Sequence, residues 1–255
     1  MGWLTEWNRR RILAGNPVDE QTWRQASEGL SILNGLTETE RRRLQEFAIL
    51  FLSDKSMECA GGLHLTHPQR LRIALLACLP VLNLGLDWYD GWHAVIVYPD
   101  EFVTDHEEMD EAGVVHRIHE PRSGESWQHG PMIVTWAPIE NPDLYPDHNL
   151  VIHECAHKLD TLNGAANGFP PLHRGMSAKE WADVFGEAFG DFQKRVDEDQ
   201  ETLIDPYGAE APEEFFAVVS EVFFAAPWIL KEEYPQVYEQ LVLFYRQDPA
   251  RRIAE

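Results

Sequence analysis

Hydrophobic positions in the first 80 residues recur every three or four residues, which is the period of a helix with one face in the core. The clearest stripe of this kind is formed by Leu44, Phe47, Ala48 and Phe51. Thr37 and Glu40 stand before it at the spacing of a capping box, which marks the start of a helix. Pro68 opens another apolar helical segment, over residues 68–79. We therefore expect residues 1–85 to form a mainly helical N-terminal part.

The pattern changes after residue 85, where short runs rich in β-branched and aromatic residues predict strands. Residues 92–98 read as a buried strand, and the alternating residues 113–119 read as a half-exposed one. Residues 132–136 form a third run, with Pro131 and Pro138 on either side. Proline at both ends is typical of a strand at the edge of a sheet. These runs predict a small mixed sheet.

Helical periodicity returns in the second half of the chain. The predicted helices there are one that starts near Leu150, followed by residues 177–199, a segment opened by Pro212, and residues 234–246. Asn149 is suited to cap the first of them, and Asn163-Gly164 is suited to end it. The fold class is therefore α+β. We expect one unit over residues 1–255, made of the helical N-terminal part and a catalytic part over residues 86–255.

Composition and charge narrow the possible functions. Residues 1–80 carry 10 Lys and Arg against 9 Asp and Glu, whereas residues 81–255 carry 11 against 34. This acidic half argues against a nucleic-acid ligand, because phosphate binding needs a positive face. The longest apolar run, residues 71–86, is too short for a membrane span. Three cysteines and no apolar signal segment predict a cytoplasmic protein with reduced thiols.

The most specific motif is H-E-x-x-H, formed by His153, Glu154 and His157. Residues four apart lie on the same face of a helix, so both imidazoles can bind one metal ion. Glu154 is then placed to take a proton from a water molecule at that ion. Because the flanking signals put this motif in the middle of a helix, we expect one Zn²⁺ per chain. Two surface histidines are the alternative explanation.

A third protein ligand is needed for such a site. Asn163 stands where a third histidine would be found six residues after the motif, so that route is closed. The helix opened by Pro212 is strongly apolar, yet it carries Glu213, Glu214 and Glu221. Carboxylates in such a helix are costly unless they are paired or bind a metal. We expect Glu214 as the ligand and Glu221, on the same face, as acceptor of a hydrogen bond from a ligating imidazole. The spacing also allows the acidic pair to be simple first-turn residues favoured by the helix dipole.

Two sequence runs together resemble a known family. His153-Glu154-Cys155-Ala156-His157-Lys158-Leu159-Asp160, with Tyr207-Gly208 and Glu214-Phe215-Phe216-Ala217, is similar to the Mlc titration factor A family of zinc metallopeptidases and to the catalytic domain of anthrax lethal factor. The resemblance implies a zincin-like (gluzincin) fold. It also implies that the zinc ligands are the two motif histidines and Glu214, and that Tyr207, seven residues before Glu214, stabilises the transition state.

The expected activity is hydrolysis of a peptide or protein substrate, with aminopeptidase and endopeptidase action both open. Asp160 is expected to support the ligands together with Glu221. The substrate backbone is expected to pair with Ile133, Val134 and Thr135, since peptides can add to a sheet edge. The family name also implies a transcriptional repressor as partner, so a repressor-sequestering factor with weak or latent peptidase activity is the alternative. A structural zinc site is less favoured, because such sites prefer four protein ligands.

Overall fold

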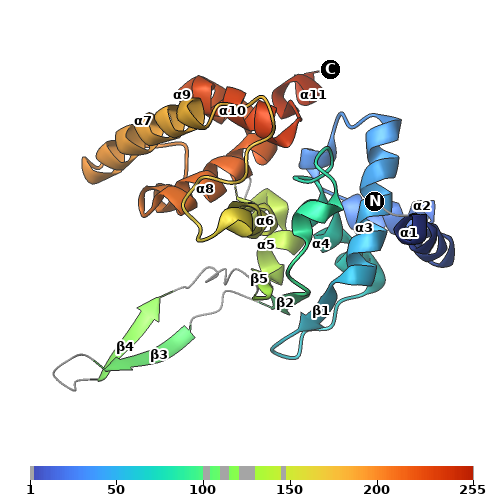
Figure 1. Ribbon diagram of the computed structural model, residues 1–255. Coiled ribbons are helices and arrows are strands. Elements are labelled where there is room, and N and C mark those ends of the chain that lie inside the picture. Colours follow the sequence, from blue (N-terminus) through green and yellow to red (C-terminus); the bar gives the residue numbers. More distant parts are fainter. Residues whose placement is uncertain (1–2, 100–103, 110–114, 121–129, 145–147, 255) are drawn as a thin grey trace.

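The computed structural model describes residues 3–99, 104–109, 115–120, 130–144 and 148–254. The first half contains α1 (Trp3–Gly15), α2 (Glu20–Ser27), α3 (Glu38–Asp54), β1 (Ser56–Cys59), α4 (His67–Cys78), β2 (Ala94–Tyr98), β3 (Thr104–Met109), β4 (Val115–Glu120), β5 (Met132–Thr135) and α5 (Trp136–Glu140). The second half contains α6 (Leu150–Asp160), α7 (Ala178–Asp197), α8 (Pro212–Ala225), α9 (Pro227–Glu233), α10 (Pro235–Tyr245) and α11 (Pro249–Ala254). Figure 1 shows α6 near the middle, with the N-terminal helices and the C-terminal helices to either side.

The N-terminal helices begin where the sequence predicts. The backbone N–H of Glu40 donates to the Thr37 hydroxyl oxygen, and the backbone N–H of Thr37 donates to the Glu40 carboxylate, so the capping box at α3 is present. Asp19 caps α2 in the same way, by accepting from the backbone N–H of Thr22. Each cap satisfies backbone donors that would otherwise have no partner at a helix start. The mainly helical character of this part is confirmed.

The sheet corrects the prediction of a mixed arrangement. Among the described residues it has three strands in the order β1-β2-β5, and both pairs are parallel. Strand β1 lies in the part expected to be helical, and α4 connects it to β2, as parallel pairing requires. β1 has only four residues, which are alternately exposed and half-buried, so its sequence pattern is too short to predict a strand there. Of the strand predicted over residues 113–119, residues 113 and 114 lie outside the described part of the chain. The rest belongs to β4, which pairs antiparallel with β3 in a separate two-stranded sheet.

Strand β5 occupies one edge of the sheet, as its flanking prolines predict. It ends one residue earlier than expected, since Trp136 already begins α5. Helix α6 packs against β5 on one side and against α8 on the other. Its residues Val151, Ile152, Cys155, Ala156 and Leu159 are fully buried. The motif helix is therefore held between the sheet and the C-terminal helices.

Aromatic side chains fill the space between the C-terminal helices. Trp181 and Phe185 of α7 stack with ring centroids 4.1 Å apart, and both rings lie against Phe216 of α8. Phe244 of α10 contacts the same cluster through Trp181 and Phe216. Large buried rings of this kind dominate core energetics. They fix α8 firmly, which matters because α8 carries the acidic residues proposed to act at the site.

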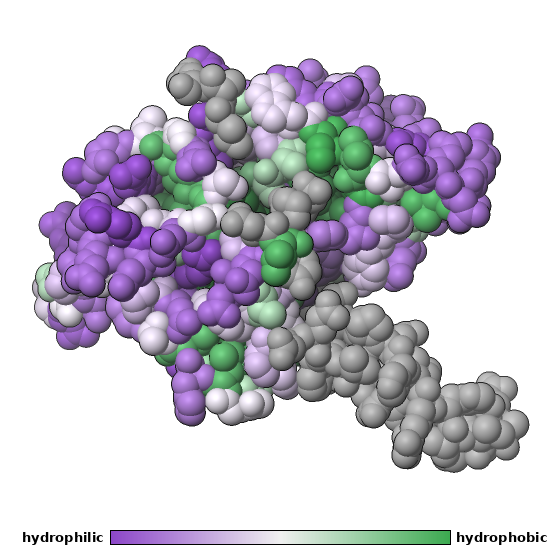
Figure 2. Space-filling view, turned by 180° about the vertical axis from the view of Figure 1, so that it is seen from behind, coloured by the Kyte–Doolittle hydropathy of each residue, from purple (hydrophilic) through white to green (hydrophobic). Residues whose placement is uncertain are grey.

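The surface is mostly hydrophilic, and Figure 2 shows apolar side chains in separate patches on one face. The exposed large apolar residues in the described chain are Trp7, Leu144, Leu162, Leu203, Trp228 and Leu243. They come from different elements, and isolated apolar residues of this kind are ordinary on protein surfaces. Within the described residues, every helix is too short or too polar to form a transmembrane span.

A buried lysine joins the N-terminal helices to the segment before β2. The Lys55 ammonium donates to the carbonyl oxygens of Tyr89 and Trp92 at 2.8 and 2.6 Å, and it forms an ion pair with Asp54. It also lies 4.6 Å from the centre of the Trp92 ring. The buried Lys55 ammonium is therefore hydrogen-bonded and paired with a carboxylate. This matters because an unpaired charge in the core would be very costly.

We expect Lys55→Met to lower the free energy of unfolding by about 2 kcal/mol or more, because it leaves two buried carbonyl groups without a donor. Urea unfolding monitored by circular dichroism measures this loss. The control is Lys194→Met, since Lys194 is exposed and forms an ion pair with Glu198 at 3.9 Å; its effect should stay within about 0.5 kcal/mol. Equal losses in the two variants would contradict the role assigned to Lys55.

Candidate metal centre

Helix α6 presents the two motif histidines on one face. Asn149 caps this helix by accepting from the backbone N–H of Ile152 at 3.1 Å. His153 and His157 follow one turn apart, and their residues are only 4% and 3% exposed. The helix ends at Asp160 and continues as a short 3-10 helix, Thr161–Asn163, before Gly164 takes a positive φ. The motif thus lies within a capped, buried helix, as the sequence predicts.

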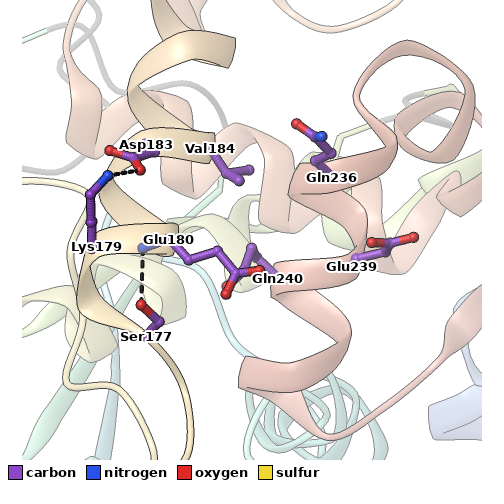
Figure 3. A pocket seen from close by; sticks show the side chains of 8 residues that line it. All are labelled: Ser177, Lys179, Glu180, Asp183, Val184, Gln236, Glu239 and Gln240. Carbon is purple, nitrogen blue, oxygen red and sulfur yellow. Dashed lines mark hydrogen bonds and ion pairs between the residues drawn. The ribbon is translucent and has the colours of Figure 1, made fainter.

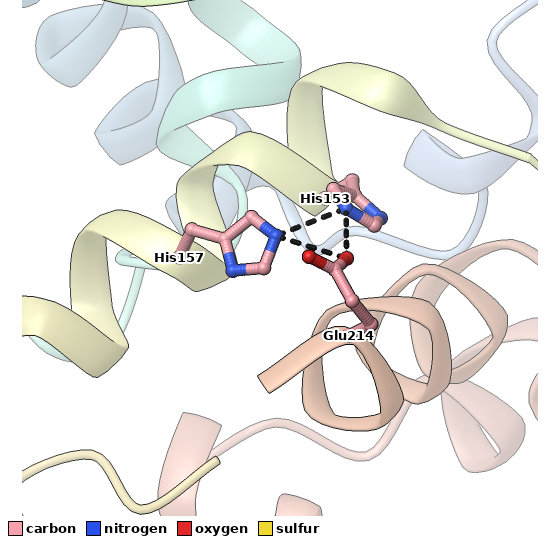
Figure 4. Close-up of side chains that lie close together, drawn as sticks. All are labelled: His153, His157 and Glu214. Carbon is pink, nitrogen blue, oxygen red and sulfur yellow. Dashed lines mark hydrogen bonds and ion pairs between the residues drawn. The ribbon is translucent and has the colours of Figure 1, made fainter. Parts of the chain in front are cut away.

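Helix α8 brings Glu214 to these histidines. Pro212 occupies its first turn, so Glu214 lies at the N-terminal end of the helix, where a carboxylate is favoured by the helix dipole. Glu214 Oε2 is 3.1 Å from His153 Nε2 and 3.3 Å from His157 Nε2, and the two Nε2 atoms are 3.1 Å apart. Figure 4 shows the three side chains converging from the two helices.

This donor set fits a tetrahedral metal ion. Donor atoms about 2.0–2.1 Å from a central zinc ion are about 3.3–3.4 Å from one another in a tetrahedron. The three observed separations are close to that value. Two imidazoles and one carboxylate form a donor set for a divalent transition-metal ion, and Zn²⁺ is one ion that such sets bind. His153, His157 and Glu214 are the residues within the described chain whose donor atoms lie close enough together to hold a metal. Glu213 is half-buried and does not belong to this group.

Glu221 lies behind the first histidine. His153 Nδ1 faces Glu221 Oε1 at 2.7 Å, while the other carboxylate oxygen accepts from the backbone N–H of Asn149. With Nε2 directed toward Glu214, this contact requires the hydrogen on Nδ1. A carboxylate that accepts this hydrogen fixes the ring and makes the ligand more basic. The geometry is the one expected for Glu221 from its spacing to Glu214.

The contacts between imidazoles and carboxylates also shift the pKa values of His153 and Glu214. Burial opposes protonation of His153, but the hydrogen bonds that its ring donates to the Glu214 and Glu221 carboxylates outweigh burial and raise the pKa of His153 to about 10. Burial raises the pKa of Glu214, but the two imidazoles reverse this and lower the pKa of Glu214 to about 2. Without a metal, the site therefore holds an imidazolium beside carboxylates. A metal ion would take the place of that proton.

Glu154 is almost fully enclosed beside the metal group. It is 1% exposed, and its Oε1 atom has no hydrogen-bond partner among the described residues. Burial raises the pKa of Glu154, although the positive charges of His153, His157 and Lys158 counteract this. A carboxylate of raised pKa in an enclosed site is suited to accept and return a proton.

Sequence reasoning missed Lys158, which is buried one turn after Glu154. Its ammonium donates to the carbonyl of Gly130 at 3.0 Å and lies 5.7 Å from the centre of the Trp92 ring. Gly130 stands just before β5, so this contact ties the motif helix to the start of the edge strand. Gly130 and Trp92 are distant from Lys158 in the sequence, so no local pattern predicts that this lysine is buried.

The remaining expected residues lie on α6, on β5 and on the short 3-10 helix before α8. The Tyr207 ring, on the short 3-10 helix Pro206–Ala209, has its centroid 6.0 Å from that of His153. Asp160 is fully buried, and its Oδ2 atom accepts from the backbone N–H groups of Asn167 and Gly168. On β5, Ile133 is half-buried, whereas Val134 and Thr135 are buried.

Two surface hollows differ in their relation to the metal group. One, with a volume of about 380 Å³, lies between α7 and α10 and is lined by Ser177, Lys179, Glu180, Asp183, Val184, Gln236, Glu239 and Gln240 (Figure 3). Neither of its helices contributes to the metal group. A second, of about 240 Å³, is lined by residues that include Asp205, Val218 and Glu221. Only the second adjoins the site, through Glu221.

Comparison with known proteins places these features in one group. A family model described as "Glucose-regulated metallo-peptidase M90" matches residues 4–246. A protein of Klebsiella pneumoniae strain 342 named "Mlc titration factor A" is 41% identical over 238 residues, which cover 92% of this chain and 89% of that protein. A protein of the same name from Escherichia coli O9:H4 strain HS is 40% identical over 236 residues, covering 91% and 88%.

We expect the affinity for Zn²⁺ to rise with pH, because the ion must displace the proton that Glu214 and Glu221 hold on His153. The raised pKa of about 10 means that this proton is present at pH 7. The zinc association constant should then rise about tenfold per pH unit between pH 7 and 9, with release of about one proton. Chelator competition at several pH values, with calorimetry in two buffers of different ionisation enthalpy, measures both quantities. A pH-independent constant would refute the assignment.

Proposed function

The chain belongs to the M90 family of glucose-regulated metallo-peptidases, and on this basis we propose that it hydrolyses peptide bonds with one Zn²⁺ held by His153, His157 and Glu214. The observation that carries the proposal is the convergence of these donors beside the enclosed carboxylate of Glu154. The described chain offers three ligands rather than the four that a structural zinc site prefers. Three ligands leave room for water and substrate.

The proposed chemistry divides between the metal and the protein. A zinc ion bound at this position would act as a Lewis acid, which lowers the pKa of a bound water molecule and polarises the substrate carbonyl. Glu154 takes the proton from the attacking water and delivers it to the nitrogen of the leaving amine. The raised pKa of this buried carboxyl favours both steps, since the group must accept and then give up the same proton.

Tyr207 is proposed to stabilise the oxyanion that forms from the substrate carbonyl. Its ring lies beside His153, and its backbone N–H donates to Asp205 at 2.9 Å, which holds the turn that carries it. A phenol hydroxyl can donate a hydrogen bond to a developing negative charge, where such a bond is strongest. Glu221 and Asp160 are proposed to support the ligands from behind.

Strand β5 is proposed to bind the substrate backbone through Ile133, Val134 and Thr135. It lies at an edge of the sheet and packs beside α6, which carries the metal ligands. The side chains of Val134 and Thr135 are buried, so recognition along the strand would come mainly from main-chain hydrogen bonds. Such contacts fix the direction of a peptide with little demand on its sequence.

A repressor-binding role is the second candidate. The similar proteins carry the name "Mlc titration factor A", which points to an interaction with the repressor Mlc in those proteins. We propose that this chain has a similar protein partner besides its peptide substrates. The prediction of a cytoplasmic location agrees with such a partner and stays a prediction.

Glu154→Gln should keep the metal and lose activity. Glutamine preserves the shape of the side chain but cannot take the proton, so kcat should fall by a factor of about 10² to 10⁴.

Glu214→Ala should instead weaken zinc binding, and Glu213→Ala, one residue away in the same helical turn, is its matched control. Metal content and hydrolysis of a broad peptide set measure both effects. Zinc binding without cleavage by the wild type would favour the repressor-binding candidate, and unchanged zinc affinity in Glu214→Ala would sink the ligand assignment.

Tyr207→Phe removes only the phenol hydroxyl. We expect kcat to fall by a factor of about 10² while KM and zinc affinity stay near their wild-type values, because the hydroxyl acts in the transition state. Steady-state kinetics and a zinc titration separate these quantities. Tyr234→Phe is the control, since the Tyr234 hydroxyl bonds to Asp191 away from the metal group. Equal kcat in Tyr207→Phe and wild type would exclude the role.

A further inference from the structure

Gly168 lies in a narrow space beside the helix that carries Glu214. Its φ is +73°, and a Cβ added to it would be 2.5 Å from the carbonyl oxygen of Pro212. Pro212 is the first residue of α8, two positions before Glu214 in the same turn. The backbone of Gly168 therefore sits directly against the turn of α8 that positions the third ligand.

The opposite side of Gly168 is held by the motif helix. Its N–H donates to Asp160 Oδ2 at 2.7 Å, and the N–H of Asn167 donates to the same oxygen at 2.8 Å. Asp160 is the last residue of α6, three positions after His157, and it is fully buried. In addition, the indole N–H of Trp181 donates to the Gly168 carbonyl at 3.1 Å.

These contacts make Gly168 a spacer between two helices. From α6 a carboxylate accepts the Gly168 N–H, and toward α8 there is no room for a Cβ beside the Pro212 carbonyl. A shift of Gly168 away from α8 would break its hydrogen bonds to Asp160 and Trp181. A larger side chain therefore presses on the first turn of α8 and displaces Glu214 relative to His153 and His157.

We propose that Gly168, held in place by Asp160, sets the separation of the two ligand helices and thereby the affinity of the site for its metal ion. The inference rests on the proposed zinc function, adds Gly168 to it as a positioning residue, and specifies how Asp160 supports the ligands. An ordinary contact for the added methyl group needs about 1 Å more space, which exceeds the roughly 0.5 Å tolerance of a working metal site. Glu214 would then lie too far from the histidines to complete the tetrahedron.

The test compares Gly168→Ala with Gly175→Ala by zinc competition against a chelator on the folded proteins. Gly175 also has a positive φ, +105°, but a Cβ there would have no neighbour within 4 Å. Both substitutions strain the backbone, yet only the first presses on α8. Gly168→Ala should weaken zinc binding about tenfold or more, whereas Gly175→Ala should lower only the thermal stability. A purely structural role would lower thermal stability in both and leave zinc affinity alike.

Asp160→Asn is the second variant, and it decides the matter if Gly168→Ala does not fold. Asparagine keeps the shape of the side chain but accepts the two N–H groups more weakly than a carboxylate. We expect a loss of zinc affinity in the same direction, of about threefold to tenfold. Zinc affinity equal to that of Gly175→Ala in every folded variant would overturn the proposal. Failure of the wild type to bind zinc would instead overturn the proposed function.

Discussion

The rest of the structure depends on the burial of charged side chains where α6 meets α8. His153, Glu214 and Glu221 come together where the protein excludes most water, and isolated charges are very costly there. Their close hydrogen bonds compensate for this cost in the absence of a metal, with a proton retained on His153. The pairing of the helices, the aromatic core behind α8 and the cap of α6 all serve to hold these groups at fixed distances. A site built in this way is already formed before any ligand arrives.

Several of these features can be predicted from the sequence because they depend on local chemistry. The capping box of Thr37 and Glu40 and the Asn149 cap each require only a few neighbouring residues. The spacing of His153 and His157 and that of Glu214 and Glu221 follow from the period of a helix. The two pairs meet in space because α6 and α8 pack together. The seven-residue spacing to Glu221 already favoured Glu214 over Glu213, and the family resemblance strengthened that choice.

Other features cannot be predicted from the sequence because they depend on contacts between distant segments. β1 is a four-residue strand with exposed positions, so its place in a parallel sheet is determined by α4 and β2 rather than by its own residues. Gly168 looks like any loop glycine until Pro212 is found against it. Lys158 appears to be a surface charge until Trp92 and Gly130 are seen around it. The pairing of β1, the close approach to Gly168 and the burial of Lys158 all depend on tertiary packing, which a local sequence pattern does not predict.

The position of β1 has a consequence for how the protein avoids aggregation. β2 is central in the sheet, and Val95 and Val97 are fully buried there. Without β1, one edge of this apolar strand would be open, and such edges are templates for pairing with other chains. β1 pairs with this edge, although it is only four residues long and its residues are partly exposed. The Arg70 guanidinium in turn donates to the Met57 carbonyl of β1 at 2.7 Å. Pairing with β1 therefore covers this edge of β2, and we expect a fragment that lacks the N-terminal part to expose the edge and to self-associate more readily.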